Sequence, residues 1–111
     1  MNNGIDSIKE EKSEGDLERC LMLFMVIEKF KNRSARQVYC RARQKGRMLP
    51  EGLHYINSWV TTDFDRCFQL MKTEDPALFR KWTAQWEDLV EFEIIPVVSS
   101  EDANKAVLDP I

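Results

Sequence analysis

The stretch Leu21-Met22-Leu23-Phe24-Met25-Val26-Ile27 decides the fold, because it is apolar at every position. A strand that alternates between apolar and polar residues has one face in water, whereas an unbroken apolar run is covered on both faces. We therefore expect a central strand over residues 21–30. Further signals follow it in the order helix, strand, strand, helix, strand.

Turn and cap residues divide the rest of the chain. Ser34 with Gln37 has the capping-box spacing and predicts a helix over residues 35–45, ended by Gly46. Strands are expected over residues 53–61 and 66–73. Asp75-Pro76 predicts the start of a second helix, which carries apolar residues at spacings of three and four. A last strand is expected over residues 90–98, and it contains Pro96, which is typical of a strand at the edge of a sheet.

The element order βαββαβ is that of the ferredoxin-like fold. We expect an α+β domain over residues 21–100, with a four-stranded antiparallel sheet, two helices on one face, and strands one and three in the centre. Residues 1–20 hold six acids, three bases and few apolar anchors, so they are predicted to be a disordered acidic tail. Residues 101–111 are expected to form a short C-terminal helix or tail.

Two helices cover only one face of such a sheet, so the other face needs a cover that this chain does not contain. A second copy is the simplest candidate. We therefore expect a homodimer joined through the sheet face opposite the helices. A charge introduced at Phe24 or Met25, whichever points away from the helices, is expected to dissociate or unfold it.

Composition excludes several classes of function. No apolar run approaches the length of about 20 residues that a membrane span needs, and the N-terminus lacks a signal-peptide core, so we expect a cytoplasmic protein without a membrane partner. Cys20, Cys40 and Cys67 lie far apart and are accompanied by one histidine, a pattern that predicts reduced thiols, no metal site and no cofactor. Outside the tail, acids and bases are equal in number, so no net field attracts nucleic acid.

The strongest polar signal is a basic segment with seven bases and no acid between Lys31 and Arg47. Arg36, Arg43 and Arg47 are spaced by seven and four residues, which places them on one stripe of a helix. Such a stripe is typical either of an anion or nucleic-acid site or of a solvated face. We favour the solvated face, because the chain lacks the aromatic strand motif with which this topology binds RNA.

A few side chains are candidates for chemistry. His54 titrates near neutrality, and His54 or Tyr39 are the weak candidates for proton transfer. Gln69 is expected in the middle of a central strand, where a buried amide must find a hydrogen-bond partner or contact a ligand. Trp59, Trp82 and Trp86 are candidates for the walls of a cleft between sheet and helices, although aromatic residues at helical spacing are more often core.

Several motifs together resemble a functionally uncharacterised bacterial family, known only as a domain of unknown function. The resemblance spans residues 22–98 and rests on these segments: Leu23-Phe24-Met25-Val26-Ile27, Pro50-Glu51-Gly52, Ser58-Trp59, Arg66-Cys67-Phe68-Gln69-Leu70-Met71, Asp75-Pro76, and Trp86-Glu87-Asp88-Leu89-Val90-Glu91-Phe92-Glu93 with Pro96-Val97-Val98. The fold is also similar to the dimeric α+β barrel superfamily, which includes cofactor-independent monooxygenases, haem-degrading enzymes and stress-response proteins. That similarity implies two sheets packed face to face but no function, and no catalytic residues of those enzymes match this chain.

Three functions follow from these observations. The first is a homodimer, non-catalytic or binding a small apolar or anionic ligand in a cleft walled by Trp59, Trp82 and Trp86. The second is a cofactor-independent monooxygenase or isomerase acting on an aromatic substrate in that cleft, with His54 or Tyr39 moving protons. The third is a module that binds acidic partners through the basic stripe.

Overall fold

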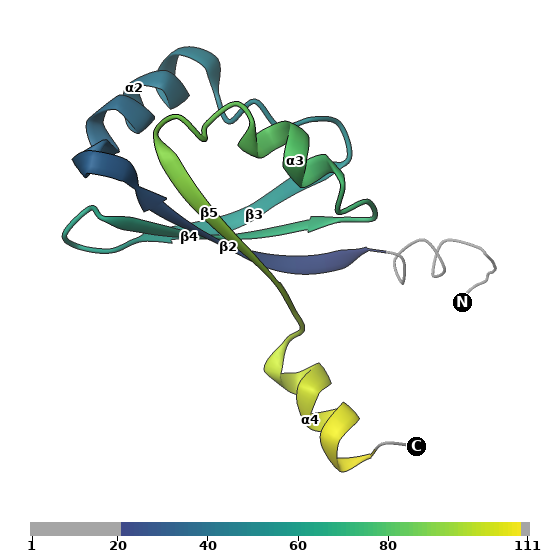
Figure 1. The fold of residues 1–111 in the computed structure, drawn as a ribbon. Helices are drawn as coiled ribbons and strands as arrows, with labels where there is room; N and C mark the ends of the chain where they lie inside the picture. Colours follow the sequence, from purple (N-terminus) through teal and green to yellow (C-terminus); the bar gives the residue numbers. More distant parts are fainter. Residues whose placement is uncertain (1–20, 110–111) are drawn as a thin grey trace.

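The computed structural model describes residues 21–109, so the predicted tail over residues 1–20 lies outside the described residues. One antiparallel sheet has the strand order β3-β4-β2-β5, and α2 and α3 cover one of its faces (Figure 1). This confirms the predicted α+β class and is consistent with the ferredoxin-like arrangement, although a 3-10 turn after the first strand and a further helix at the end make the element order differ from βαββαβ. The elements are β2 (Met22–Phe30), η1 (Lys31–Arg33), α2 (Ala35–Lys45), β3 (Leu53–Val60), β4 (Arg66–Thr73), α3 (Leu78–Thr83), β5 (Val90–Val97) and α4 (Ser100–Leu108).

Strand β2 lies in the centre of the sheet between β4 and β5. Its side chains alternate between the two faces, so Phe24 and Val26 are buried under the helices while Met25 and Ile27 point to the other side. The Phe24 ring packs edge to face on Phe79 of the α3 helix, with 5.0 Å between ring centroids. Met25 is therefore the residue of the predicted pair that points away from the helices.

The helices follow the predicted positions, with two differences. Helix α2 covers Ala35–Lys45 as expected, but the Ser34 hydroxyl does not cap it and instead donates to the Leu89 carbonyl, 2.8 Å away. This hydrogen bond ties the start of α2 to the start of β5, and it takes the side chain away from the capping position. Helix α3 ends at Thr83, and a series of turns carries the chain to Val90.

A β-bulge interrupts strand β3. The register with β4 shifts between Tyr55 and Asn57, so Ile56 is the extra residue. Before the bulge, Leu53 and Tyr55 face the helices; after it, Ser58 does. One inserted residue thus reverses which side chains of the second half of β3 reach the helix side.

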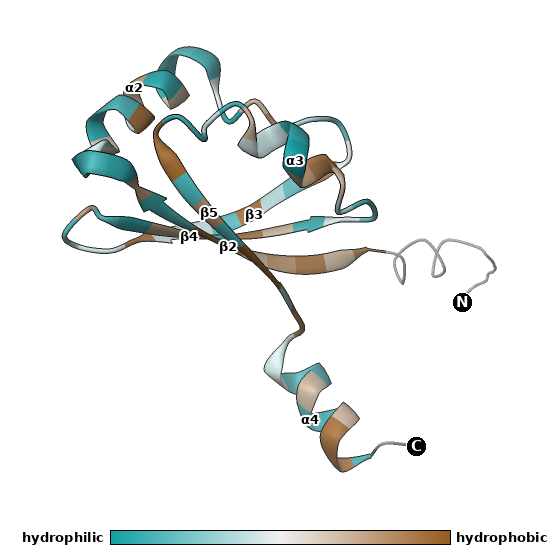
Figure 2. Cartoon of the chain, viewed as in Figure 1, coloured by the Kyte–Doolittle hydropathy of each residue, from teal (hydrophilic) through white to brown (hydrophobic). Residues whose placement is uncertain are grey.

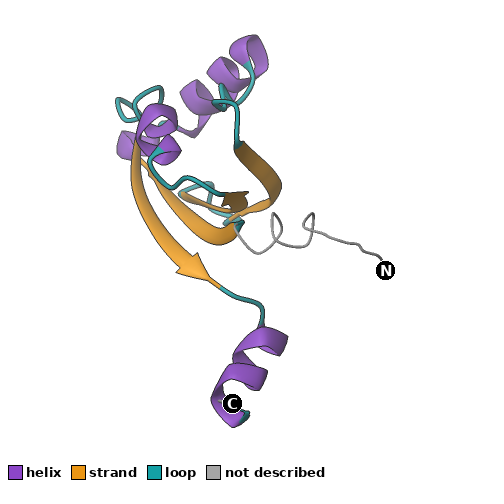
Figure 3. Cartoon of the chain, turned by 90° about the vertical axis from the view of Figure 1, so that its right-hand side faces the viewer, coloured by secondary structure: helices purple, strands orange, loops and turns teal. Residues whose placement is uncertain are grey.

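The sheet face opposite the helices, here called the open face, carries no layer of structure within residues 21–109 (Figure 3). Helix α4 extends away from the domain at the end of β5, on the side opposite α2 and α3 (Figures 1 and 3). In Figure 2, α2 is mostly coloured as hydrophilic, whereas the first part of β2 is coloured as hydrophobic. The apolar residues of the open face are Leu23, Met25, Ile27, Trp59, Phe68, Leu70, Ile95 and Val97.

Candidate functional site: a cavity between the sheet and the helices

A cavity of about 430 Å³ lies on the helix side of the sheet. It brings together four of the six residues proposed from the sequence for chemistry or for the cleft walls, namely Tyr39, Gln69, Trp82 and Trp86. This volume falls within the range of small-molecule pockets, which are mostly apolar with a few placed polar groups. The other lining residues are Glu28, Phe30, Val38, Ala42, Arg43, Gly46, Arg47, Ser58 and Cys67.

Two predicted site residues lie on the wrong side of the sheet for this cavity. Trp59 pairs with Phe68 on the open face and is 53% exposed, so the expectation that it walls the cleft is wrong. The bulge at Ile56 is the cause, because it turns Ser58 toward the helices and Trp59 away from them. His54 pairs with Lys72 on the open face and is exposed, so it does not reach the cavity.

The buried polar group of the cavity is a pair formed by Glu28 and Gln69, each only 6% exposed. Glu28 lies opposite Cys67 in the β2–β4 ladder and Gln69 lies opposite Val26, so the two side chains are diagonal neighbours on one face. The Gln69 Nε2 donates a hydrogen bond to Glu28 Oε2. The remaining oxygen of Gln69, Oε1, is buried and has no hydrogen-bond partner among the described residues.

Burial strongly perturbs the carboxyl group of Glu28. Loss of water raises its pKa from 4.5 to about 7, and the hydrogen bond from Gln69 and the positive charge of Arg47 offset this only in part. Glu28 therefore changes charge near neutral pH. A carboxyl group poised in this way inside a cavity is typical of a functional position.

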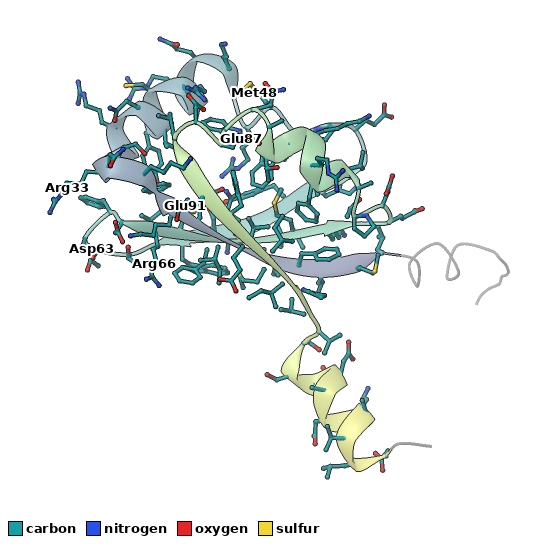
Figure 4. The ribbon with its side chains drawn as sticks, in the orientation of Figure 1. Arg33, Met48, Asp63, Arg66, Glu87 and Glu91 are labelled. Carbon is teal, nitrogen blue, oxygen red and sulfur yellow. The ribbon has the colours of Figure 1, made fainter. Side chains whose placement is uncertain are left out.

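The backbone of Arg47 holds two tryptophans of the cavity wall beside the Glu28–Gln69 pair. Gly46 and Met48 on either side of Arg47 have positive φ angles of 69° and 60°, a sharp reversal after α2 that presents the Arg47 carbonyl to the helix layer. The indole Nε1 atoms of Trp82 and Trp86 both donate to that carbonyl, at 3.0 and 3.1 Å. Both indole rings are thereby held in place. Met48, labelled in Figure 4, lies on the helix side of the sheet.

The Arg47 side chain also has a defined position. Its guanidinium lies 3.5 Å from the centroid of the Tyr55 ring, a cation–π contact. The Tyr55 hydroxyl in turn is 2.7 Å from the Ser58 hydroxyl, which belongs to the cavity lining. Arg47, Tyr55 and Ser58 form a connected group along one side of the cavity.

Two further titratable groups line the cavity. Burial raises the pKa of the Tyr39 hydroxyl, and neighbouring Cys67 and Glu28 add to this effect. Burial also raises the pKa of the Cys67 thiol to about 12, so this cysteine remains protonated near neutral pH and is a poor nucleophile. Tyr39 can donate a hydrogen bond to a molecule in the cavity, whereas Cys67 contributes mainly apolar surface.

The predicted basic stripe is divided between α2, which carries Arg36 and Arg43, and the turn after it. Arg47 lies beyond the end of α2, and Arg43 and Arg47 line the cavity whereas Arg36 does not. Arg41, from the same basic segment, makes a two-pronged ion pair with Asp88 at 2.9 and 2.7 Å, which lowers the pKa of Asp88 to about 2. Asp88, in the turns between α3 and β5, thus neutralises the charge of Arg41 on α2.

Sequence reasoning missed Glu28 and the role of Arg47. Glu28 follows the apolar run directly and has the same parity as Phe24, Val26 and Phe30, so alternation alone places an acid at a core position. That violation of the core pattern was the available signal. No sequence signal marked the Arg47 carbonyl, because its role depends on two indoles that lie 35 and 39 residues away.

Over residues 21–109, no three His, Cys, Asp or Glu side chains come together as metal ligands do. The helices of this part are all too short or too polar to cross a membrane.

Fold and cavity together define a small α+β domain with a polar pair in an aromatic-walled cavity. The chain belongs to a family described as a domain of unknown function (DUF3303), whose model matches residues 22–110. This confirms the family resemblance noted from the motifs. No match to the chain was found among curated proteins, and none among solved structures.

Proposed function

We propose that this protein is a homodimer that binds a small apolar or anionic molecule in the cavity between the sheet and the helices. The observation that carries the binding proposal is the buried Glu28–Gln69 pair inside an aromatic-walled space of about 430 Å³. A buried acceptor without a partner costs about 1–3 kcal/mol. Apolar side chains at both positions would avoid that cost, so the pair is better explained by a ligand than by stability.

The three tryptophans make the binding proposal testable. Trp82 and Trp86 line the cavity and Trp59 lies on the open face, so a Trp59→Phe variant keeps only the cavity indoles as fluorophores. Toluene as the apolar probe and phenylacetate as the anionic probe are titrated against this variant. We expect at least one probe to change the indole emission saturably in the millimolar range and to raise the melting temperature.

A cavity-filling variant provides the control for the location. Ala42 lines the cavity from α2, and Ala42→Phe is expected to abolish binding by occupying the space. Gln37→Phe adds the same ring at an exposed position of the same helix and should leave binding intact. Unchanged emission and melting temperature with both probes at millimolar concentration would refute the proposal.

The dimer proposal rests on the open face. Its apolar centre is bordered by bases on β4, Arg66 and Lys72, and by acids on β5, Glu91 and Glu93. A copy related by a two-fold axis parallel to the strands sets β5 of one subunit against β3 and β4 of the other. Glu91 and Arg66 both pair with Lys29, so they lie at the same level along the strands and approach each other across such an interface, whereas Lys72 lies level with Val97. The face is thus suited to a second copy of itself. Figure 4 labels Arg66 below the sheet.

Helix α4 supplies a second argument for this partner. From strand spacing and rise, four strands of eight residues present a face of roughly 19 by 26 Å, or about 500 Å², less than the roughly 800 Å² per partner of a typical stable interface. Helix α4 has nine residues, a length that is marginal for an isolated helix in water, and its Val107 is 74% exposed. Docked on the partner, α4 adds the missing area.

Sedimentation equilibrium tests the dimer. We expect a dimer at micromolar concentration and, for Met25→Lys, a dissociation constant at least roughly a hundredfold higher, because an unpaired charge is then buried. Gln37→Lys adds the same charge on the exposed side of α2 and should not change the association. Truncation after Ser99 should weaken the dimer. A stable monomer for the unmodified chain would refute this part of the proposal.

The isomerase or monooxygenase alternative has less support. Its predicted proton-transfer residue His54 lies on the open face, and only Tyr39 of that pair lines the cavity. A Glu28 carboxyl near neutrality would be the better base. The module for acidic partners also has less support, since Arg47 lies beyond the end of α2 and Arg41 of the same basic segment is already paired with Asp88.

A further inference from the structure

We infer that the cavity selects a flat molecule with a hydroxyl or N–H donor at its inner end and an acidic group at its outer end. This inference rests on the proposed binding function and names the chemical class of the ligand. Three parts of the cavity carry it: the polar pair at the floor, the fixed aromatic wall, and two arginines at the rim.

The floor of the cavity is an acceptor site. Glu28 and Gln69 are buried, and their single mutual hydrogen bond uses the amide nitrogen of Gln69 and one carboxylate oxygen. Gln69 Oε1 has no partner within residues 21–109, so the pair still lacks a donor when Glu28 is ionised. A ligand hydroxyl or N–H placed against the pair would supply that donor. An anionic group there would meet the Glu28 carboxylate and be repelled.

The walls favour a flat molecule. Trp82 and Trp86 are buried, and their shared acceptor, the Arg47 carbonyl, fixes both rings before any ligand arrives. Phe30 and Tyr39 line the same space and stack edge to face on each other, with 6.4 Å between ring centroids. Preorganised aromatic walls bind planar apolar groups without a further ordering cost.

The rim favours an acid. Arg43 and Arg47 line the cavity and are both exposed, in contrast to Glu28 and Gln69, so their charges lie at its outer side. The Arg47 guanidinium is already positioned by its contact with the Tyr55 ring. Guanidinium groups are suited to carboxylates, which they bind with two parallel hydrogen bonds. The polarity of the site therefore runs from acceptors at the floor to cations at the rim.

Four matched probes separate these requirements in the Trp59→Phe background. They are 4-hydroxyphenylacetate with donor and acid, phenylacetate with the acid only, 4-methoxyphenylacetate with the donor blocked, and 4-methylphenol with the donor only. We expect 4-hydroxyphenylacetate to bind about tenfold more tightly than each of the other three, in line with one buried hydrogen bond or one partly exposed ion pair per change.

Variants assign each preference to its residues. The double variant Glu28→Met/Gln69→Met should lose the preference for the hydroxyl but keep that for the acid. Arg43→Gln/Arg47→Gln should do the reverse, and Arg36→Gln is the matched control that changes neither. Should the double methionine variant not fold, Glu28→Gln keeps the amide pairing and an acceptor oxygen, and it is expected to lose only part of the hydroxyl preference.

The outcomes distinguish a failure of this inference from a failure of the proposed binding function. Equal affinity for phenylacetate and 4-hydroxyphenylacetate would overturn the donor at the inner end, while binding itself would stand. Equal affinity for 4-methylphenol and 4-hydroxyphenylacetate would overturn the acid at the rim. If none of the four probes binds, this inference is overturned, and if toluene does not bind either, the proposed binding function fails with it.

Discussion

Replacement of Glu28 by glutamine should change how the stability of the protein depends on pH. The carboxyl pKa is raised from 4.5 to about 7 on folding, so the folded state holds this proton more tightly than the unfolded state. Protonation of Glu28 therefore adds to the free energy of unfolding. This contribution is fully present below pH 4.5 and is lost as the pH rises through 7. Integrating the linkage between pH 5 and pH 8 gives a loss of about 2.5 kcal/mol in the free energy of unfolding.

Glu28→Gln removes this titration and keeps an oxygen that can accept the hydrogen bond from Gln69. Urea unfolding of both proteins at pH 5 and pH 8, at one protein concentration, isolates the contribution of Glu28, because all other titrating groups are shared. Relative to the unmodified protein, the variant should gain about 2.5 kcal/mol in stability from pH 5 to pH 8. A difference between the two proteins that stays constant over this range would refute the buried, perturbed carboxyl group.

Two further predictions concern positions outside the polar pair. Gly52→Ala should destabilise the protein by about 1–2 kcal/mol in urea unfolding, because φ is +98° and the added Cβ would lie 3.0 Å from Leu78 Cδ1. Gly46→Ala meets nothing within 4 Å, but it should destabilise the protein by about 1–3 kcal/mol, because φ +69° with ψ −164° is a backbone conformation of glycine. Alkylation at pH 8 followed by peptide mapping should modify exposed Cys40 rapidly and leave Cys67 unmodified, because Cys67 is buried and its thiol pKa is raised to about 12. Comparable modification of both cysteines would contradict the burial of Cys67.

The elements of the fold were readable from local patterns. The apolar run of β2, the Gly46 stop of α2 and the Pro96 edge signal are each properties of a few neighbouring residues, and the structure places all three as predicted. The capping role of Ser34 was predicted wrongly, because the prediction used only neighbouring residues. Its hydroxyl has a local option at the helix start and a distant one at the Leu89 carbonyl, and only the folded chain brings the distant one within reach.

By itself, the sequence determined the element order, the α+β class, the central place of β2 and the excess of apolar surface on one sheet face, because alternation and turn chemistry act over a few residues. Only the tertiary structure decided the site. The bulge at Ile56 moved Trp59 out of the cavity and Ser58 into it, since one extra residue reverses the parity of a strand. The register of β2 with β4 set Glu28 beside Gln69, 41 residues apart in the chain, where burial raises the carboxyl pKa. Pairing and desolvation are properties of packed elements, and no single segment of the chain contains them.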